Sequence, residues 1–256
     1  MQFFGKSDKG MKRPENQDSF ITEQLYDNTA ICLVCDGMGG ANGGSTASSM
    51  ACTSFLKTVK KSLASSSENG QVCFEVDSND IEDIIKGGIA KANSEIYKKA
   101  KRCKKLSGMG TTLVGAVTYG SLVYVVNIGD SRLYTVTNDG ITQLTHDHSY
   151  VQALVDLGQI TPEEALTSPH KNIITKALGI SETAEPDIFR INLENHDADY
   201  ILLCTDGLTN FVSKEKIHSI ITEGTELEQI CASLIDEANA NGGGDNITAV
   251  LIKVKE

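Results

Sequence analysis

Residues 30–40 read Ala30-Ile31-Cys32-Leu33-Val34-Cys35-Asp36-Gly37-Met38-Gly39-Gly40. The first six side chains are all apolar, and a continuous apolar run of this length is typical of a buried strand. The strand ends at Asp36, because the glycine that follows lets the backbone turn sharply. The stretch therefore predicts a sheet whose edge carries a carboxylate.

The same arrangement recurs three times further along the chain. Apolar runs end at Gly129-Asp130 and at Asp206-Gly207, and Gly244-Asp245 stands just before the apolar run 247–252. A single Asp-Gly pair is usually a turn, and Asp139-Gly140 has the pattern of a hairpin turn. Four carboxylates at strand ends are different, because like charges at one edge persist mainly where cations hold them together. Ligands that are all oxygen atoms favour Mg²⁺, Mn²⁺ or Ca²⁺.

Composition narrows the function classes. The chain has 256 residues with no visible linker or repeat, so we expect a single domain over residues 1–256. A net charge of −11 disfavours nucleic-acid binding through phosphate contacts. No apolar run approaches the roughly 18 residues that span a bilayer, and the start lacks the apolar stretch of a signal peptide. We therefore expect no membrane partner. Seven cysteines, mostly in apolar segments, are typical of reduced thiols, so we expect a cytoplasmic protein.

Short strand-like runs joined by short turns make up most of the chain. Two helical patterns follow one another over residues 47–63 and 81–100, and a third covers 227–238. Thr225 and Glu228 have the spacing of a capping box that would start this third helix. Because strands and helices do not alternate, we expect antiparallel sheets covered by helices. The strand-like runs are residues 3–7, 20–25, 30–35, 111–118, 122–128, 131–137, 141–144, 188–193, 200–205 and 247–254.

Three smaller features have plain interpretations beside functional ones. Residues 147–172 interrupt the strand pattern with short helical pieces, one starting at Thr161, and we expect a flap over a site. The basic stretch 98–105 is interpreted as a solvated face favoured by the helix dipole, with a docking patch as the alternative. Cys32 and Cys35 form a C-x-x-C, but on a strand they point to opposite faces, so we expect neither a metal nor a redox role.

Eight ordered motifs surround the aspartates. In this order and spacing the chain resembles the metal-dependent protein serine/threonine phosphatases of the type 2C (PPM) family, bacterial subgroup, from about Gly5 to Lys253. The resemblance implies an α+β fold, a four-layer α-β-β-α sandwich of two antiparallel sheets flanked by helix pairs. The motifs are residues 13–18, 36–40, 109–112, 129–132, 144–149, 172–179, 204–208 and 244–248.

The resemblance also implies a set of metal ligands, by motif matching. Asp36 would bridge two ions, and Asp206 and Asp245 would complete the first. The carbonyl of Gly37 would bind the second ion, with Asp18 helping through water. The expected cofactors are Mn²⁺ or Mg²⁺ ions. Two ions would be bound tightly, with a third, more weakly bound ion as an option.

Three further positions receive roles from the same matching. Asp130 would touch the third ion, which it would share with an acid in the flap. Arg13 would grip the substrate phosphate, and Asn246 would support the metal loop. Arg132 is interpreted as structural, paired with a carboxylate. His146 and His148 are interpreted as polar loop residues.

The expected chemistry is independent of the family name. A phosphate monoester dianion resists attack by water, and two cations neutralise its charge and lower the pKa of a bridging water toward about 7. Arg13 offers a planar, permanently charged fork that matches phosphate oxygens. Cys35 lacks the C-x5-R loop of cysteine phosphatases and is interpreted as a core residue.

Departures from the family pattern limit what can be transferred. Gln17 stands where animal members carry a glutamate ligand, so the second ion would be held mostly by water. Met38 stands where animal enzymes have a histidine proposed as general acid, and Ala41 near where many bacterial relatives have one. The source of the leaving-group proton is therefore open.

The predicted function is hydrolysis of phosphoserine and phosphothreonine in proteins by a cytoplasmic, monomeric bacterial signalling enzyme. Its expected partners are phosphorylated proteins, a serine/threonine kinase among them. A catalytically weak regulator that binds phosphoproteins on the same fold is the alternative. A Ca²⁺-binding structural protein is a third reading, but loops such as D-x-D-x-D-G are absent. The substrate protein and the physiological metal do not follow from the sequence.

Overall fold

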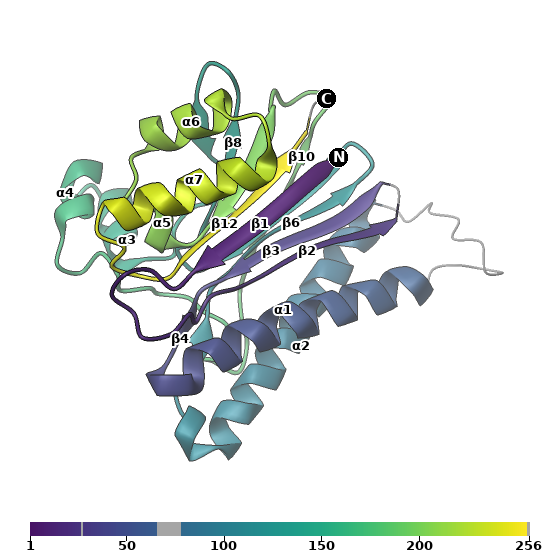
Figure 1. Cartoon of the computed structure of the whole chain (residues 1–256). Helices are drawn as coiled ribbons and strands as arrows, with labels where there is room; N and C mark the ends of the chain where they lie inside the picture. Colours follow the sequence, from purple (N-terminus) through teal and green to yellow (C-terminus); the bar gives the residue numbers. More distant parts are fainter. Residues whose placement is uncertain (27, 66–77, 255–256) are drawn as a thin grey trace.

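Two five-stranded antiparallel sheets form the centre of the molecule (Figure 1). A computed structural model describes residues 1–26, 28–65 and 78–254. One sheet has the order β1-β12-β11-β8-β9, and the other has the order β10-β7-β6-β3-β2. The first contains β1 (Gln2–Asp8), β12 (Ile247–Lys253), β11 (Tyr200–Cys204), β8 (Arg132–Val136) and β9 (Ile141–Gln143). The second contains β10 (Asp187–Asn192), β7 (Leu122–Ile128), β6 (Leu113–Tyr119), β3 (Thr29–Cys35) and β2 (Ser19–Tyr26).

The sheets pack face to face, and β3 shows why its sequence is apolar without interruption. Cys32 and Val34 point into the core between the sheets, where Leu203 of β11 and Val250 of β12 also lie. The alternate residues of β3 belong to a different core on the other face. A strand buried on both faces needs apolar side chains at every position, and all seven residues of β3 are buried.

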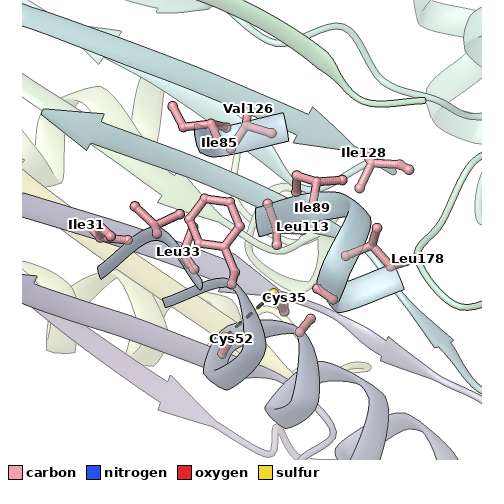
Figure 2. Close-up of a cluster of buried hydrophobic side chains, with 14 of the residues drawn as sticks. Ile31, Leu33, Cys35, Cys52, Ile85, Ile89, Leu113, Val126, Ile128 and Leu178 are labelled. Carbon is pink, nitrogen blue, oxygen red and sulfur yellow. Dashed lines mark hydrogen bonds between the residues drawn. The ribbon is translucent and has the colours of Figure 1, made fainter. Parts of the chain in front are cut away.

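A pair of helices covers the outer face of each sheet. Helices α1 (Gly40–Ser65) and α2 (Ser78–Arg102) pack on the sheet that contains β3, and α6 (Lys214–Glu223) and α7 (Leu227–Ala240) pack on the other. Figure 2 shows the α1–α2 side, with Cys35 of β3 beside Cys52 of α1, their sulfur atoms 3.6 Å apart. The four-layer α-β-β-α sandwich is confirmed, as is the opposite orientation of Cys32 and Cys35.

The sequence reading of the last helix pair was incomplete. Helix α6 was not predicted, and the capping box of Thr225 and Glu228 is wrong. Helix α7 begins at Leu227 after Glu226, whose side chain makes no capping hydrogen bond. A Cβ at Gly224 would lie 2.3 Å from Ile230, so tight packing of the interhelical turn on Ile230 places Thr225 before the helix.

The connections that surround the site gather at one end of the sandwich. In Figure 1, α3 (Tyr150–Asp156), α4 (Pro162–Thr167), α5 (Asp206–Thr209) and the short strand β4 (Gly37–Met38) lie away from the chain termini. The predicted start of α4 is confirmed, since Thr161 and Glu164 form a capping box around Pro162. Strand β4 pairs with β5 (Gly110–Thr111), which follows the 3-10 turn η1 (Lys104–Leu106). None of the described helices is both long and apolar enough to cross a membrane.

Candidate metal centre

A cavity of about 770 Å³ opens at this end of the sandwich, and most of the predicted site residues line it. Asp18 is the exception, since it lies behind the cavity wall with 9% of its surface exposed. The structure therefore brings together residues that the sequence separates by more than 200 positions. The predicted residues on the wall are Arg13, Asp36, Gly37, Asp130, Asp206 and Asp245.

Asp36 sits where β3 ends, and the neighbouring chain fixes its backbone. The Asp36 N–H donates to Thr112 Oγ1 at 2.9 Å, and the Asp36 carbonyl accepts from the Thr112 N–H at 2.9 Å. Thr111 Oγ1 donates to the same carbonyl at 2.8 Å. Thr112 also hydrogen-bonds Ser131 at 2.7 Å, next to Asp130. The motif around Met109–Thr112 thus holds two of the acidic loops in place, a role that sequence reasoning missed.

Two glycines let the acidic loops approach their neighbours closely. A Cβ at Gly37 would lie 2.2 Å from the carbonyl oxygen of Gly44, and one at Gly207 would lie 1.9 Å from that of Asn246. Any larger residue at either position would force backbone apart, so glycine follows Asp36 and Asp206 for steric reasons. The Asp-Gly pairs are parts of packed site loops rather than simple turns.

Asp18 is held by hydroxyl groups. Its Oδ2 accepts from Thr248 Oγ1 at 2.7 Å and from Thr205 Oγ1 at 3.0 Å. Its Oδ1 is buried and has no hydrogen-bond partner among the described residues. Buried acceptors without partners are rare, and a bound cation is one common explanation. Both threonines lie within motifs that the sequence singled out, but sequence reasoning assigned neither of them this contact with Asp18.

Neighbouring groups engage one oxygen of Asp206 and both oxygens of Asp245. Asn210 Nδ2 donates to Asp206 Oδ2 at 2.9 Å, while Asp206 Oδ1 is buried without a partner among the described residues. Asp245 Oδ1 accepts from the backbone N–H of Asn246 at 2.8 Å. Asp245 Oδ2 accepts from Arg13 Nη2 at 2.8 Å, a contact that raises the pKa of Arg13.

Asn246 ties the N-terminal loop to the acidic loop beside it. Its Oδ1 accepts from the Gln17 N–H at 2.8 Å, and its Nδ2 donates to the carbonyls of Lys9 and Glu15 at 2.9 Å each. These contacts surround Arg13, so they fix the segment that presents the arginine to the cavity. The predicted supporting position of Asn246 agrees with this geometry.

The carboxylates repel one another strongly. Burial, followed by repulsion from Asp18 and Asp206, raises the pKa of Asp36 well above its usual range. Burial is also the main cause that raises the pKa of Asp18 to about 7 and that of Asp130 to about 8, and in both cases Asp206 adds repulsion. The pKa of Asp206 is raised by burial and by Asp245. Holding acidic groups together at this cost is typical of a cation site.

The donor set fits hard divalent cations. Every candidate side chain offers carboxylate oxygens, and two of these oxygens, on Asp18 and Asp206, are buried without partners among the described residues. Across residues 1–26, 28–65 and 78–254, no three His, Cys, Asp or Glu side chains converge tightly enough to hold an ion as they stand. Binding would therefore require side-chain rotations that bring the carboxylates closer together. Their mutual repulsion opposes this movement, and a bound cation would favour it.

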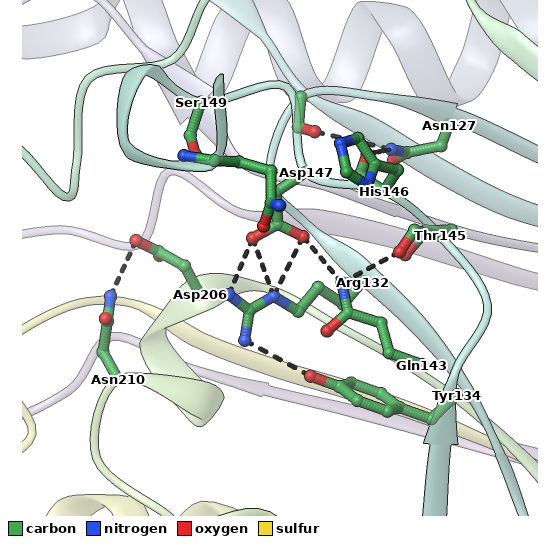
Figure 3. A network of polar contacts seen from close by, with 12 residues as sticks. Asn127, Arg132, Tyr134, Gln143, Thr145, His146, Asp147, Ser149, Asp206 and Asn210 are labelled. Atoms are coloured by element: carbon green, nitrogen blue, oxygen red, sulfur yellow. Dashed lines mark hydrogen bonds and ion pairs between the residues drawn. The ribbon is translucent and has the colours of Figure 1, made fainter. Parts of the chain in front are cut away.

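A buried polar network supports the wall beside Asp130 (Figure 3). Arg132 donates from Nε and Nη2 to Asp147 Oδ2 at 2.9 and 2.6 Å, and Gln143 Nε2 donates to Asp147 Oδ1 at 2.8 Å. The structural interpretation of Arg132, paired with a carboxylate, is thus consistent with the contacts. The positive charge of Arg132 also opposes the rise in the pKa of Asp206. Asp147, which anchors the start of the flap, was not identified from the sequence.

Comparison with known proteins agrees with this geometry. The family model described as Protein phosphatase 2C matches residues 10–235. The chain belongs to the protein phosphatase 2C family. It is 36% identical over 248 residues to a serine/threonine phosphatase stp of Listeria monocytogenes, covering 97% of this chain and 94% of that protein.

Solved structures place the whole chain in the same fold. The serine/threonine phosphatase Stp1 of Staphylococcus aureus superposes with a TM-score of 0.84 and 34% identity, covering 100% of this chain and 95% of that one. The catalytic domain of the phosphatase PstP in complex with two manganese ions superposes with a TM-score of 0.81 and 31% identity, covering 100% and 98%. The chain is therefore a serine/threonine protein phosphatase, as the sequence predicted, and the alternative of a catalytically weak regulator is not favoured.

Gln17, which departs from the phosphatase 2C pattern, and the two histidines near the flap all have partners outside the proposed metal positions. The Gln17 amide nitrogen donates to Glu15 Oε1 at 2.6 Å and to the Gly40 carbonyl at 3.1 Å, so the side chain is committed to local contacts. His146 Nε2 lies 2.8 Å from Asp156, and His148 Nε2 lies 3.1 Å from Asp187. Neither histidine lines the cavity.

His148 is a structural residue. Its Nδ1 accepts from the Gly129 N–H at 3.1 Å, which leaves Nε2 to donate to Asp187 and indicates the neutral tautomer. Burial, followed by the charge of Lys176, lowers the pKa of His148. The side chain therefore positions the Gly129-Asp130 loop and is not placed to protonate a leaving group in the cavity.

Proposed function

We propose that this phosphatase hydrolyses phosphoserine and phosphothreonine in proteins at a centre of two or three divalent cations held by the cavity carboxylates. The observation that carries the proposal is the convergence of Asp36, Asp206 and Asp245 on one cavity, with raised pKa values for Asp36 and Asp206. Bound Mn²⁺ or Mg²⁺ would supply charge neutralisation of the phosphate and acidification of the attacking water.

Each acidic residue has an assigned place in this proposal. Asp36 would help to hold two cations, and Asp206 and Asp245 would complete the first position. The Gly37 carbonyl would serve the second position, which Asp18 would support through water from behind the wall. This division is supported by the partnerless oxygens of Asp18 and Asp206, since each is free to accept a cation or a cation-held water.

Asp130 is proposed to hold a third and weaker cation. It lines the same cavity as Asp206, and Asp206 and Asp147 both contribute to the raised pKa of its carboxyl group. The acid of the flap that faces it is Asp147, but two oxygens of that side chain are already engaged by Arg132 and Gln143. A site built mainly from one available carboxylate binds weakly, which supports a lower affinity at this position.

Arg13 is proposed to bind the substrate phosphate. Its side chain is 53% exposed at the cavity mouth, and Nη2 holds Asp245. A guanidinium has five N–H donors, so the contact with Asp245 leaves donors for phosphate oxygens. The same contact keeps the fork pointed at the acidic wall before substrate arrives.

The cellular role follows from the class of substrate. We infer a cytoplasmic, monomeric enzyme, folded as one domain, that acts on phosphorylated proteins, including those modified by a serine/threonine kinase of a bacterial signalling pathway.

The test is a metal-dependence assay on two substrates. Hydrolysis of p-nitrophenyl phosphate and of a phosphothreonine peptide should require added Mn²⁺ or Mg²⁺, and EDTA should abolish both. Re-addition of Mn²⁺ in excess over EDTA should restore both, which controls for loss of folded protein. Full turnover in EDTA would contradict a cation-dependent mechanism.

A further inference from the structure

Six cations lie together at the end of α2 and in the turn that follows it. All six side chains are exposed, and residues 96–109 contain no acidic residue. They represent about a quarter of the 23 Lys and Arg residues of a chain whose net charge is −11. We call this group the α2 basic run; it consists of Lys98, Lys99, Lys101, Arg102, Lys104 and Lys105.

The helix dipole does not account for the whole run. Cations near a helix C-terminus are favoured only within about the last turn. Helix α2 ends at Arg102, whereas Lys104 and Lys105 lie beyond it in η1. A second factor must therefore explain why positive charge continues past the helix.

The charges of the run also lack the local partners that other lysines of α2 have. Lys86 pairs with Glu82 at 2.8 Å, and Lys91 pairs with Glu95 at 3.0 Å. Within the described residues, no carboxylate forms an ion pair with a member of the run; Lys101 instead lies 5.2 Å from the ring centre of Tyr97. The run therefore presents positive charge that is available to an external anion.

The α2 basic run lies close to the rim of the cavity. Its last member, Lys105, is three residues before Gly108, a distance of at most about 11 Å along an extended chain. Gly39 lines the cavity, and a Cβ there would lie 3.1 Å from the Gly108 carbonyl oxygen and 2.7 Å from Met109 Cα. Strand β5, just after Met109, pairs with β4 on the cavity wall.

We propose that the α2 basic run binds acidic side chains or additional phosphates of the phosphoprotein substrate, beside the residue that is dephosphorylated. The inference rests on the proposed function and adds a substrate class to it. An extended peptide spans about 3.3 Å per residue, so the preferred anions lie roughly three to six residues from the phosphorylated residue. Without the run, an acidic substrate would approach a protein of net negative charge and a cavity wall that is mainly acidic.

An anionic membrane fits the same charge less well. Outside the run the chain is even more acidic than its net charge of −11, so a lipid surface would repel most of the molecule. None of the exposed large apolar side chains lies within residues 96–109, so nothing beside the run is placed to insert into lipid. A peptide segment needs only the local patch, which is why we favour the substrate.

The experiment compares matched peptides on a charge-neutralised variant. The variant carries Lys101→Gln, Lys104→Gln and Lys105→Gln, none of which is in the proposed metal or phosphate site. Phosphothreonine peptides carry four aspartates, or four asparagines, at three to six residues on either the N- or the C-terminal side. For one of the two sides, the unmodified enzyme should show a higher kcat/KM for the aspartate peptide. The variant should lose about tenfold on that peptide, since three exposed ion pairs, each of them weak, would be lost together.

A second variant controls for net charge. Lys57→Gln, Lys60→Gln and Lys86→Gln remove three exposed lysines from α1 and α2, and Lys86 lies about 24 Å along α2 from its end. This control should change kcat/KM on aspartate peptides by less than twofold. The preference of the unmodified enzyme should also shrink when salt is raised from 0.05 to about 0.5 M, because screening lengths then become shorter than the spacing of the groups.

The outcomes separate this inference from the proposed function. Hydrolysis of p-nitrophenyl phosphate and of asparagine peptides should be the same in all three proteins, and its absence would refute the proposed function instead. Equal rates on aspartate and asparagine peptides, or equal losses in both variants, would overturn the substrate role. The substrate role would also be overturned if the unmodified enzyme bound vesicles containing 30% phosphatidylserine, the Lys101, Lys104 and Lys105 variant did not, and both proteins had the same peptide selectivity. That result would assign the run to a membrane surface.

Discussion

Thr248 donates a hydrogen bond from Oγ1 to Asp18 Oδ2 at 2.7 Å and thereby joins the two sheets at the edge of the cavity. Thr248 belongs to β12 of one sheet, while Asp18 immediately precedes β2 of the other. Thr205, at the end of β11, adds a second hydroxyl at 3.0 Å. One oxygen of Asp18 is thus fixed by both neighbours, which leaves the partnerless oxygen in a defined direction.

Replacing Thr248 by valine should weaken cation use at the position that Asp18 supports. The substitution keeps the shape of the side chain but removes one donor from a buried carboxylate, at a cost of about 1–3 kcal/mol in the free energy of unfolding. Denaturant unfolding in EDTA would measure this loss, and the Mn²⁺ concentration for half-maximal activity should rise. Thr142→Val, at an exposed position of β9, is the control. An unchanged Mn²⁺ requirement would mean that Thr248 has a structural role only.

The stability of the cation-free protein should fall as the pH rises. The pKa of Asp18 is about 7 and that of Asp130 about 8 in the folded protein, against an ordinary value of 3.8. Between about pH 4 and pH 8 the folded state therefore holds protons that the unfolded chain has released, so stability decreases across this window. The melting temperature in EDTA should be lower at pH 8 than at pH 6. A melting temperature that rises over this interval would contradict the burial of these groups as repelling acids.

Added Mn²⁺ should reverse that trend. Cations bind the deprotonated carboxylates, so the increase in melting temperature on adding Mn²⁺ should be larger at pH 8 than at pH 6. Calorimetric titrations at pH 6.5 in two buffers of different ionisation enthalpy would count the protons released on binding. Release of no protons would show that the acidic groups are already ionised without a cation.

Asp206→Asn should separate activity from stability. The variant loses a negative charge that contributes to the raised pKa values of Asp18, Asp36 and Asp130. Activity should fall by several orders of magnitude, because the carboxylate is a proposed ligand of the first cation. In EDTA at pH 8 the variant should nevertheless melt at or above the temperature of the unmodified protein. A variant that is less stable under these conditions would indicate that Asp206 is needed for folding.

Arg13 gives a prediction about binding. Arg13→Ala should mainly raise KM, because it removes phosphate contacts from the ground state and the transition state alike. Arg13→Lys should recover only part of the effect, since an ammonium lacks the planar fork. Steady-state kinetics with a phosphothreonine peptide would measure both. Substrate binding that is normal in Arg13→Ala would show that the residue serves only to hold Asp245.

The parts of the site that sequence predicted are those with a local signature. An apolar run that ends in Asp-Gly marks Asp36 and Asp206, because the strand and the steric need for glycine are both short-range features. The same local logic identified the start of α4 at Thr161. Such signals predict which carboxylates stand at sheet edges, and the order of the motifs predicts that they meet.

The sequence did not predict the residues that hydrogen-bond the acidic side chains of the site. Thr248 in β12 and Thr205, the N-cap residue of α5, have no distinct role until the two sheets pack and bring them to Asp18. In the sequence, Asp147 cannot be told apart from other polar loop residues. Its role depends on folding of the hairpin, which brings Arg132 within hydrogen-bond distance of its side chain. The capping box at Thr225 failed for the same reason, because packing of Gly224 on Ile230 determines where α7 begins.

Asp130→Ala should affect two substrates unequally. An alkoxide from serine or threonine needs a proton to leave, whereas p-nitrophenolate does not. Met38 lines the cavity but cannot donate a proton, and neither His146 nor His148 lines it. Asp130 does line it, so a water acidified by the cation proposed to bind there would be the simplest remaining proton source.

The variant should therefore lose more activity on a phosphothreonine peptide than on p-nitrophenyl phosphate. Asp139→Ala, in the exposed turn after β8, removes a carboxylate of the same kind and should change neither rate by more than twofold. The ratio of kcat values on the two substrates is the measurement, and it does not depend on the amount of active protein. Equal losses on both substrates would mean that Asp130 acts in nucleophile formation or phosphate binding. A role in protonating the leaving group would affect only the alkoxide, because p-nitrophenolate leaves without a proton.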